Sequence, residues 1–216
     1  TPHEPLSAPP SAQYDDHLQG RRRAFGAIAT RQDAKIGSVV KSLKDNDMWP
    51  STLMIVLSDN GAAATGGANY PLRGAKGGVW EGGVRTRALM SGPLIPKNVR
   101  GSSYKGLFHA SDWMPTILSV AGIPHTDDGD GVDQWDAIKG LNTPPRDEVL
   151  IHVDTSSYGL TGAIRRGRWK LLLNVKREPV YDRTAESAPL DWLADEAATY
   201  LYDLEADPSE AVDLSA

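Results

Sequence analysis

The sequence of 216 residues contains no cysteine, and this absence removes three kinds of chemistry at once. Disulfide bridges, thiolate metal sites and a cysteine nucleophile are all excluded within these residues. The sequence also lacks an apolar run of about 18 residues or more, the length that a membrane-spanning helix needs. We therefore expect no membrane span in this chain.

Positive charge is scarce as well. The formal net charge is −5, and the only basic run is the short stretch Arg21-Arg22-Arg23, which is typical of a solvated helix face. The sequence thus predicts no nucleic-acid partner. The five histidines include no pair at the spacing of metal ligands, and no Gly-x-Ser-x-Gly motif of a serine hydrolase occurs.

What is present is the rhythm of an α/β fold. Apolar residues recur at three- and four-residue steps over residues 16–43, which predicts an amphipathic helix. Residues 52–57 are continuously apolar, which favours a strand buried on both faces, as in a parallel sheet covered by helices. Residues 84–89 suggest another strand, and Ser111 or Asp112 can begin a helix that Gly122 ends.

The pattern changes near residue 147. Residues 148–153 and 200–204 are strand-like, and residues 163–175 suit a hairpin, with a helix expected over residues 190–198. We therefore expect two units, an α/β domain over residues 1–147 and a small antiparallel α+β lobe over residues 148–216.

The first candidate for chemistry is Asp59-Asn60, directly after the predicted buried strand. In open α/β sheets, ligands bind beyond the carboxyl ends of the strands. A carboxylate and an amide oxygen are the ligands that Ca²⁺ or Mg²⁺ prefers. The alternative is a simple strand-to-loop turn, in which Asp-Asn-Gly is common for conformational reasons.

A glycine-rich loop follows, with eight glycines in residues 61–83. Three cations, Arg73, Lys76 and Arg85, lie in it or beside it. Backbone N–H groups and a lysine ammonium in such a loop can approach an anion. The alternative is a packed loop in which these cations pair with local carboxylates such as Glu81.

Several motifs in a fixed order resemble the sulfatase family, in particular its arylsulfatase B (N-acetylgalactosamine-4-sulfatase) type. The main strings are Ile55-Val56-Leu57-Ser58-Asp59-Asn60-Gly61, Pro71-Leu72-Arg73-Gly74-Ala75-Lys76 and Trp80-Glu81-Gly82-Gly83-Val84-Arg85. Further matching strings are His3-Glu4-Pro5-Leu6, His109-Ala110-Ser111-Asp112-Trp113, Asp130-Gly131-Val132-Asp133, Arg166-Gly167-Arg168-Trp169-Lys170 and Asp207-Pro208-Ser209-Glu210. The resemblance spans nearly the whole chain.

The resemblance implies an alkaline-phosphatase-like α/β fold with a smaller C-terminal antiparallel lobe. It implies Asp59 and Asn60 as ligands of a divalent cation, usually Ca²⁺ with Mg²⁺ possible. Lys76 and His3 would be catalytic and would bind the sulfate group, and Arg73 would be a further substrate-binding residue. The implied nucleophile is a formylglycine made from Cys or Ser.

The motif that yields this formylglycine, Cys/Ser-x-Pro-x-Arg, does not occur in the sequence. The chain therefore resembles the C-terminal portion of a sulfatase, and we expect these residues alone to be inactive and to need an N-terminal half as partner. The implied activity is sulfuric ester hydrolysis on a sulfated carbohydrate or aryl sulfate. Alternatives are a phosphodiesterase or phosphonate hydrolase of the same superfamily, or a truncated, non-catalytic binding protein. The family resemblance implies a lysosomal or secreted location.

Overall fold

The structure is a computed structural model, and it describes residues 20–124, 126, 129–157, 159–181 and 196–215. Some of the sequence-based expectations concern residues outside these ranges. Among them are the site residue His3, the first four residues of the helix expected over 16–43 and the first six residues of the helix expected over 190–198. No helix in the described ranges is long and apolar enough to cross a membrane.

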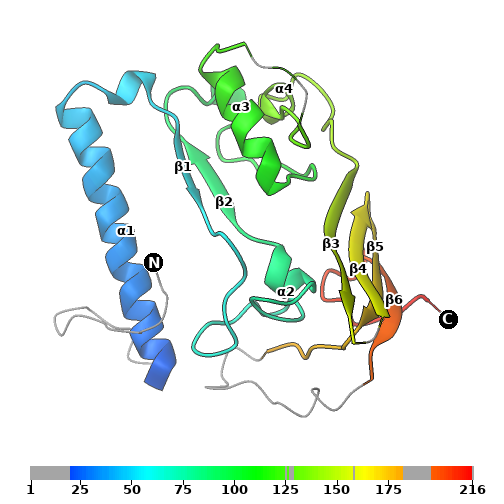
Figure 1. The fold of residues 1–216 in the computed structure, drawn as a ribbon. Coiled ribbons are helices and arrows are strands. Elements are labelled where there is room, and N and C mark those ends of the chain that lie inside the picture. The colour runs from blue at the N-terminus through cyan, green and yellow to red at the C-terminus, as the bar shows by residue number, and fades with distance from the viewer. Residues whose placement is uncertain (1–19, 125, 127–128, 158, 182–195, 216) are drawn as a thin grey trace.

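The predicted N-terminal helix is confirmed. It is α1, Gly20–Asp45, and it is followed by the short 3-10 helix η1, Trp49–Ser51. Figure 1 shows α1 standing to one side of the molecule, beside the strand that follows it. Ala27 is its one buried residue. The other described parts of the chain therefore leave most of the surface of α1 uncovered.

The expected parallel, fully buried strand is wrong in its pairing. Strand β1, Met54–Leu57, pairs antiparallel with β2, Ala88–Ser91, with Met54 opposite Ser91 and Leu57 opposite Ala88. The chain leaves β1, makes the glycine-rich loop and returns directly alongside, which is the geometry of an antiparallel connection. Leu57 and Leu89 are 47% and 60% exposed, so this pair is covered only in part.

The strand expected over residues 84–89 begins later than predicted. The segment Glu81–Val84 forms one helical turn, α2, and β2 starts only at Ala88. Gly82 and Gly83 allow this turn to pack tightly, because a Cβ at these positions would lie 2.3 Å from Gly74 O and 2.5 Å from Ala75 O.

A small helical layer follows β2. It contains η2, Lys97–Val99, η3, Ala110–Asp112, α3, Trp113–Val120, and α4, Trp135–Ile138. Helix α3 confirms the predicted start near Asp112, and Gly122, with a φ of +66°, supplies the left-handed residue that ends it. In Figure 1, α3 and α4 lie together at the end of the β1–β2 pair.

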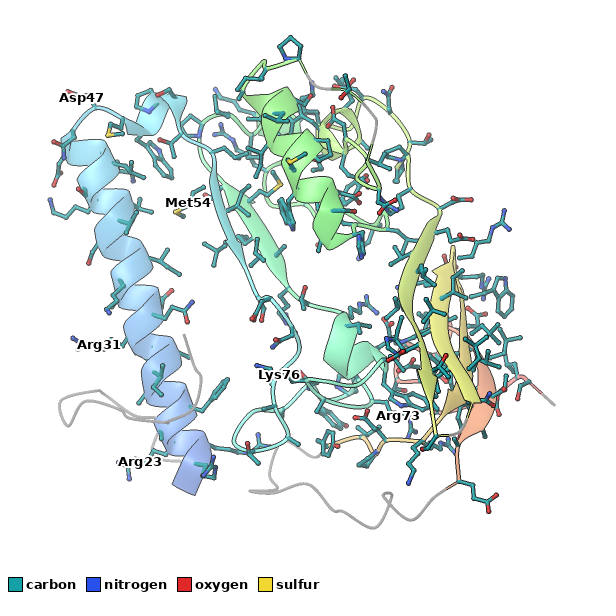
Figure 2. All side chains as sticks on the ribbon, in the orientation of Figure 1. Arg23, Arg31, Asp47, Met54, Arg73 and Lys76 are labelled. Carbon is teal, nitrogen blue, oxygen red and sulfur yellow. The ribbon has the colours of Figure 1, made fainter. Side chains whose placement is uncertain are left out.

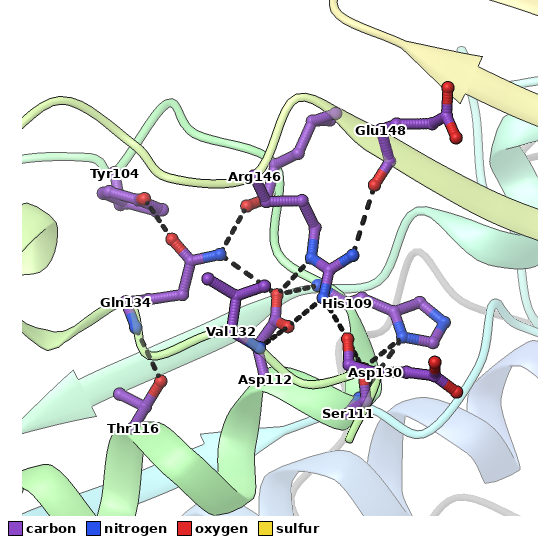
Figure 3. A network of polar contacts seen from close by, with 11 residues as sticks. Tyr104, His109, Ser111, Asp112, Thr116, Asp130, Val132, Gln134, Arg146 and Glu148 are labelled. Carbon is purple, nitrogen blue, oxygen red and sulfur yellow. Dashed lines mark hydrogen bonds and ion pairs between the residues drawn. The ribbon is translucent and has the colours of Figure 1, made fainter. Parts of the chain in front are cut away.

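This layer is held by a buried ion pair between Asp112 and Arg146. The guanidinium donates from Nε to Asp112 Oδ2 at 2.8 Å and from Nη2 to Asp112 Oδ1 at 2.5 Å. Asp112 is fully buried, and it also accepts from the backbone N–H groups of His109 and Val132 and from the side chain of Gln134. Figure 3 shows the carboxylate at the centre of this network, which joins α3 to the loops on either side of it.

The C-terminal lobe is an antiparallel sheet, as predicted. Its strands lie in the order β3, Glu148–Ser156, β4, Gly159–Arg166, β5, Trp169–Val175, and β6, Ala198–Asp203. The helix expected over 190–198 is wrong at its described end, because Glu196 and Ala197 are irregular and Ala198 begins β6.

The main hydrophobic core lies between this sheet and the glycine-rich loop. Trp80 from the loop packs against Tyr200 and Tyr202 of β6, with ring centroids 5.4 and 5.8 Å away, and against Leu172 of β5. The two predicted units therefore share a core, in which the loop is one layer and the sheet is the other.

We predict that Arg146→Met destabilises the protein by about 3–5 kcal/mol, because it leaves the Asp112 carboxylate buried without its cation. Chemical denaturation measures the change. The control is Lys41→Met, which removes an exposed lysine that pairs with Asp45 within α1. This exposed pair contributes little. An equal effect of both substitutions would contradict the structural importance of the Asp112–Arg146 pair.

A pH dependence follows from the same carboxylate. Burial pushes the pKa of Asp112 upward, but the hydrogen bonds from Arg146 and from backbone N–H groups outweigh it, and the pKa lies below the ordinary 3.8. A lowered pKa in the folded state means that its stabilisation is complete above pH 3.8 and is lost as the pH falls below it. Denaturation at a series of acidic pH values should show a smaller loss in Asp112→Asn than in the unsubstituted protein.

Candidate metal and anion site

The turn after β1 presents two oxygen-bearing side chains. Ser58 continues the ladder by donating its N–H to Arg87 O at 3.0 Å, and Gly61 then donates to Gly83 O at 2.9 Å. Between these two anchors, Asp59 is exposed and Asn60 is half-buried. The chain thus fixes both ends of a short turn and leaves its two side chains at the end of the strand.

Local hydrogen bonds orient this turn. The Asp59 carboxylate accepts from the N–H of Asn60 at 3.1 Å, and Ser58 Oγ donates to Asn60 O at 2.7 Å. The side-chain amide of Asn60 donates from Nδ2 to Gly61 O at 2.9 Å. This bond uses the Nδ2 end of the amide and fixes the orientation of the Asn60 side chain.

Asn69 closes the glycine-rich loop. Its Oδ1 accepts from the N–H of Ala62 at 2.8 Å, and its Nδ2 donates to Ala62 O at 2.9 Å and to Gly74 O at 3.2 Å. One side chain therefore replaces the backbone ladder that a sequence so rich in glycine cannot form.

The same closure places Lys76 beside the turn. The backbone N–H of Lys76 donates to Ala62 O at 3.1 Å, so the lysine lies next to the residue two positions after Asn60. Its side chain is exposed. The structure thus brings together three of the five residues expected in the site, namely Asp59, Asn60 and Lys76.

Arg73 lies on the other side of this loop. Figure 2 shows its side chain toward the β3–β6 sheet, away from Lys76. The guanidinium donates from Nε to Glu210 O at 3.0 Å and from Nη1 to Glu178 O at 2.6 Å, and it lies over the ring of Trp80. Burial lowers its pKa, and the nearby Arg177 adds to this effect. These contacts give Arg73 a place in the joint between loop and sheet, and a role in substrate binding stays a prediction.

The donor set fits a hard cation in type. Asp59 and Asn60 supply one carboxylate and one amide oxygen, which are ligands that Ca²⁺ takes at about 2.3–2.6 Å. Ca²⁺ takes about six to eight oxygens, so two side chains make only part of its shell. Among the residues that the structure describes, no group of three or more His, Cys, Asp or Glu side chains could hold a metal ion.

Sequence reasoning missed Glu178 and Pro179, which hold the loop by accepting hydrogen bonds from its backbone. Glu178 accepts the N–H of Ala75 at 3.1 Å, and Pro179 O accepts the N–H of Gly74 at 2.9 Å. Burial raises the pKa of Glu178. No motif marked Glu178, because it follows the last strand residue of β5 in a stretch without periodicity.

The local alternative for Glu81 is confirmed in part. Its carboxylate lies 3.8 Å from the guanidinium of Arg85, as a packed loop would predict, but its closest cation is Lys170, at 3.0 Å. The alternation of β5 places Lys170 on the same face as Leu172, which lies in the core, but the alternation alone does not show which face is buried.

The chain is thus an α/β protein with a carboxylate–amide turn at a strand end and a lysine near that turn. Comparison with known proteins defines its class. The family model described as Sulfatase matches residues 1–123. The chain is 33% identical to Arylsulfatase J of Mus musculus over 248 residues, an alignment that covers 99% of this chain and 40% of that protein.

Solved structures agree. The structure of Ps i-CgsB in complex with k-i-k-neocarrahexaose matches with a TM-score of 0.77 and 27% identity, over 99% of this chain and 44% of that one. The phosphonate monoester hydrolase SpPMH from Silicibacter pomeroyi, at 20% identity and a TM-score of 0.57, shares the fold over 86% of this chain and 35% of its own.

The chain belongs to the sulfatase family, and its fold is the alkaline-phosphatase-like α/β fold with a C-terminal antiparallel lobe. It spans about 40% of the length of Arylsulfatase J, the curated relative described above. The narrower resemblance to arylsulfatase B stays a prediction.

We predict that Gly61→Ala disrupts the turn. A Cβ at this position would lie 1.7 Å from Gly82 O, so the backbone has to move, at a cost of about 1–3 kcal/mol or more. The matched control is Gly37→Ala in α1, where no atom beyond the adjacent backbone of the helix lies within 4 Å of the new Cβ. That substitution should stabilise the helix by about 0.5–1 kcal/mol. Denaturation of both variants measures the difference, and a neutral Gly61→Ala would show that the turn is not packed as described.

Proposed function

We propose that the full-length protein is a sulfuric ester hydrolase that acts on sulfated carbohydrate. In this proposal the present chain supplies two metal ligands, Asp59 and Asn60, and one sulfate-binding cation, Lys76. His3 would face the sulfate group or the leaving oxygen.

The observation that carries the proposal is the hydrogen bond from Lys76 N–H to Ala62 O, at 3.1 Å. It holds the backbone of Lys76 against Ala62, two residues after Asn60, although 15 residues or more of glycine-rich chain separate Lys76 from the turn in sequence. Hydrolysis of a sulfate ester is helped by metal ligands and by a positive hydrogen-bond donor. The bound cation and the donor can then stabilise the negative charge on different sulfate oxygens.

The roles of these residues follow from their chemistry. Asp59 and Asn60 would hold Ca²⁺, with Mg²⁺ as a possible substitute, and the bound cation would polarise the sulfate oxygens. The ammonium group of Lys76 has three donors and a compact charge, which suits a single sulfate oxygen. Because the cation balances charge on one side and Lys76 on the other, the two would together orient the ester.

The nucleophile is not among these residues. The sequence contains no cysteine and no Ser-x-Pro-x-Arg string, so the expected formylglycine has no source here. We therefore expect the 216-residue chain to be inactive alone, and activity to require a segment that provides the formylglycine.

One observation favours carbohydrate as the substrate class. The likeness to Ps i-CgsB, whose structure holds a neocarrahexaose, extends over 99% of this chain. An aryl sulfate is expected to serve as a simpler substrate, and a lysosomal or secreted location is part of the proposal.

We predict that Lys76→Ala in the full-length protein lowers kcat for sulfate-ester hydrolysis about 10²- to 10³-fold, because one donor to the charged oxygens is lost. Asp59→Ala should in addition raise the Ca²⁺ concentration that gives half-maximal activity. Hydrolysis of an aryl sulfate, measured across a Ca²⁺ titration, separates the two effects.

The control is Lys97→Ala, which removes an exposed lysine from η2, outside the site. It should leave activity and Ca²⁺ dependence unchanged. Parallel assays on the matched phosphate ester and phosphonate ester test the alternatives, and a preference for either would overturn the proposal. Binding of sulfated glycan without any turnover would instead favour the non-catalytic alternative.

A further inference from the structure

Three charged side chains are buried where the glycine-rich loop meets the C-terminal sheet. Lys170 of β5 and Glu210 of the C-terminal tail are 0% exposed, and Glu81 of α2 is 2% exposed. Lys170 Nζ lies 3.0 Å from Glu81 Oε1 and 2.8 Å from Glu210 Oε1. The backbone N–H of Glu81 also donates to Glu210 Oε2 at 2.7 Å. We call these three residues the Lys170 cluster.

Stability alone does not account for such a cluster. Moving each charge out of water costs several kcal/mol, and well-packed apolar side chains of similar size are often as stable. Two further guanidinium groups approach the cluster, since Arg165 and Arg85 lie 3.7 and 3.8 Å from Glu81 Oε2. Ion pairs, unlike apolar contacts, define the position of each charged group. In this cluster the group whose position matters for the site is Glu81.

Glu81 is connected to the metal-ligand turn by a short path of backbone hydrogen bonds. Glu81 begins α2, and the next two residues of α2 contact the loop and the turn. Gly82 N–H donates to Arg73 O at 2.6 Å, and Gly83 O accepts from Gly61 N–H at 2.9 Å. Because a Cβ on Gly61 would lie 1.7 Å from Gly82 O, the turn and α2 are in direct backbone contact.

The tail residue Glu210 reaches the same loop by a second route. Its carbonyl oxygen accepts from Arg73 Nε at 3.0 Å, while its carboxylate holds Glu81 and Lys170. Burial raises the pKa of Glu210, and the ammonium group of Lys170 opposes this rise. The tail therefore contacts both ends of the segment between Arg73 and α2, at Arg73 and at Glu81.

We propose that Lys170 is a positioning residue for the cation site: through Glu81 and α2 it fixes Gly61, and with it Asp59 and Asn60. The C-terminal sheet thereby sets the geometry of the turn, although none of the proposed site residues lies in that sheet. This inference rests on the proposed function for its meaning in catalysis, but its structural content can be tested independently.

The test uses the full-length protein with Lys170→Met and, as a milder change, Glu210→Gln, which keeps the shape of the side chain but removes one of the two carboxylate charges that hold Lys170 beside Glu81. Two readouts apply besides activity. Calorimetry measures Ca²⁺ affinity, and amide hydrogen exchange measures opening of the Gly61 N–H bond relative to the Val132 N–H bond, which belongs to the distant Asp112 network.

We expect both variants to weaken Ca²⁺ binding about 10- to 100-fold, the range found when groups that orient metal ligands are removed. Exchange at Gly61 should speed up, while exchange at Val132 stays unchanged. The control is Lys139→Met, which removes a partly buried lysine paired with Asp136 at 2.7 Å in the α4 region. It should change neither readout.

Unchanged Ca²⁺ affinity and Gly61 exchange in a folded Glu210→Gln protein would overturn the inference and leave the cluster a purely structural contact. If Lys170→Met does not fold, Glu210→Gln decides alone. Failure of the proposed function is recognised separately, because the unsubstituted protein would then hydrolyse no sulfate ester, whereas the Gly61 exchange comparison still reports whether the cluster positions the turn.

Discussion

The glycine-rich loop depends on one contact, the insertion of Trp80 between the loop and the C-terminal sheet. The indole is 1% exposed, packs at a tilt against the rings of Tyr200 and Tyr202, and donates its Nε1–H to Lys176 O at 3.0 Å. A loop with so many glycines loses much conformational entropy on folding and has few side chains to pack. A large buried aromatic ring offsets part of that loss, and removal of such a ring typically costs about 3–5 kcal/mol.

Around Trp80, polar groups fix the loop conformation, which the apolar contact alone does not define. Arg73 binds two carbonyl oxygens, Glu178 caps the N–H of Ala75, and Asn69 bridges the loop to Ala62. Each of these bonds has a fixed direction, so together they define one loop conformation among the many that glycine allows. The consequence is that Lys76 lies beside the turn after β1 without any regular secondary structure between them.

The sequence was sufficient for the elements with strong periodicity. Helix α1, helix α3 and the antiparallel C-terminal sheet were predicted, because amphipathic spacing and hairpin signals are local properties of the chain. The pairing and the partial exposure of β1 were not, since a continuous apolar run predicts a buried strand but does not say what lies beside or above it. The family match confirmed the fold class that this strand had suggested.

The limits were similar within the site. Motifs indicated Asp59, Asn60 and Lys76, and the structure brings these three together. Period-two alternation in β5 groups Lys170 with Leu172 and Trp169 with Leu171, yet hydropathy would bury the second pair. The structure buries the first pair, because Glu81 and Glu210, 89 and 40 residues away in sequence, meet Lys170 there. Only the three-dimensional contact reveals that preference.

The central claim is that Asp59, Asn60 and Lys76 form one side of a cation and sulfate site. A crystal structure of the full-length protein with Ca²⁺ and a slowly hydrolysed sulfate ester tests it most directly. The account predicts the ion bound by the Asp59 carboxylate and by Asn60 Oδ1 at about 2.3–2.6 Å, with the Lys76 ammonium group on a sulfate oxygen. A Ca²⁺ ion and a sulfate group bound elsewhere, with this turn in solvent, would contradict it.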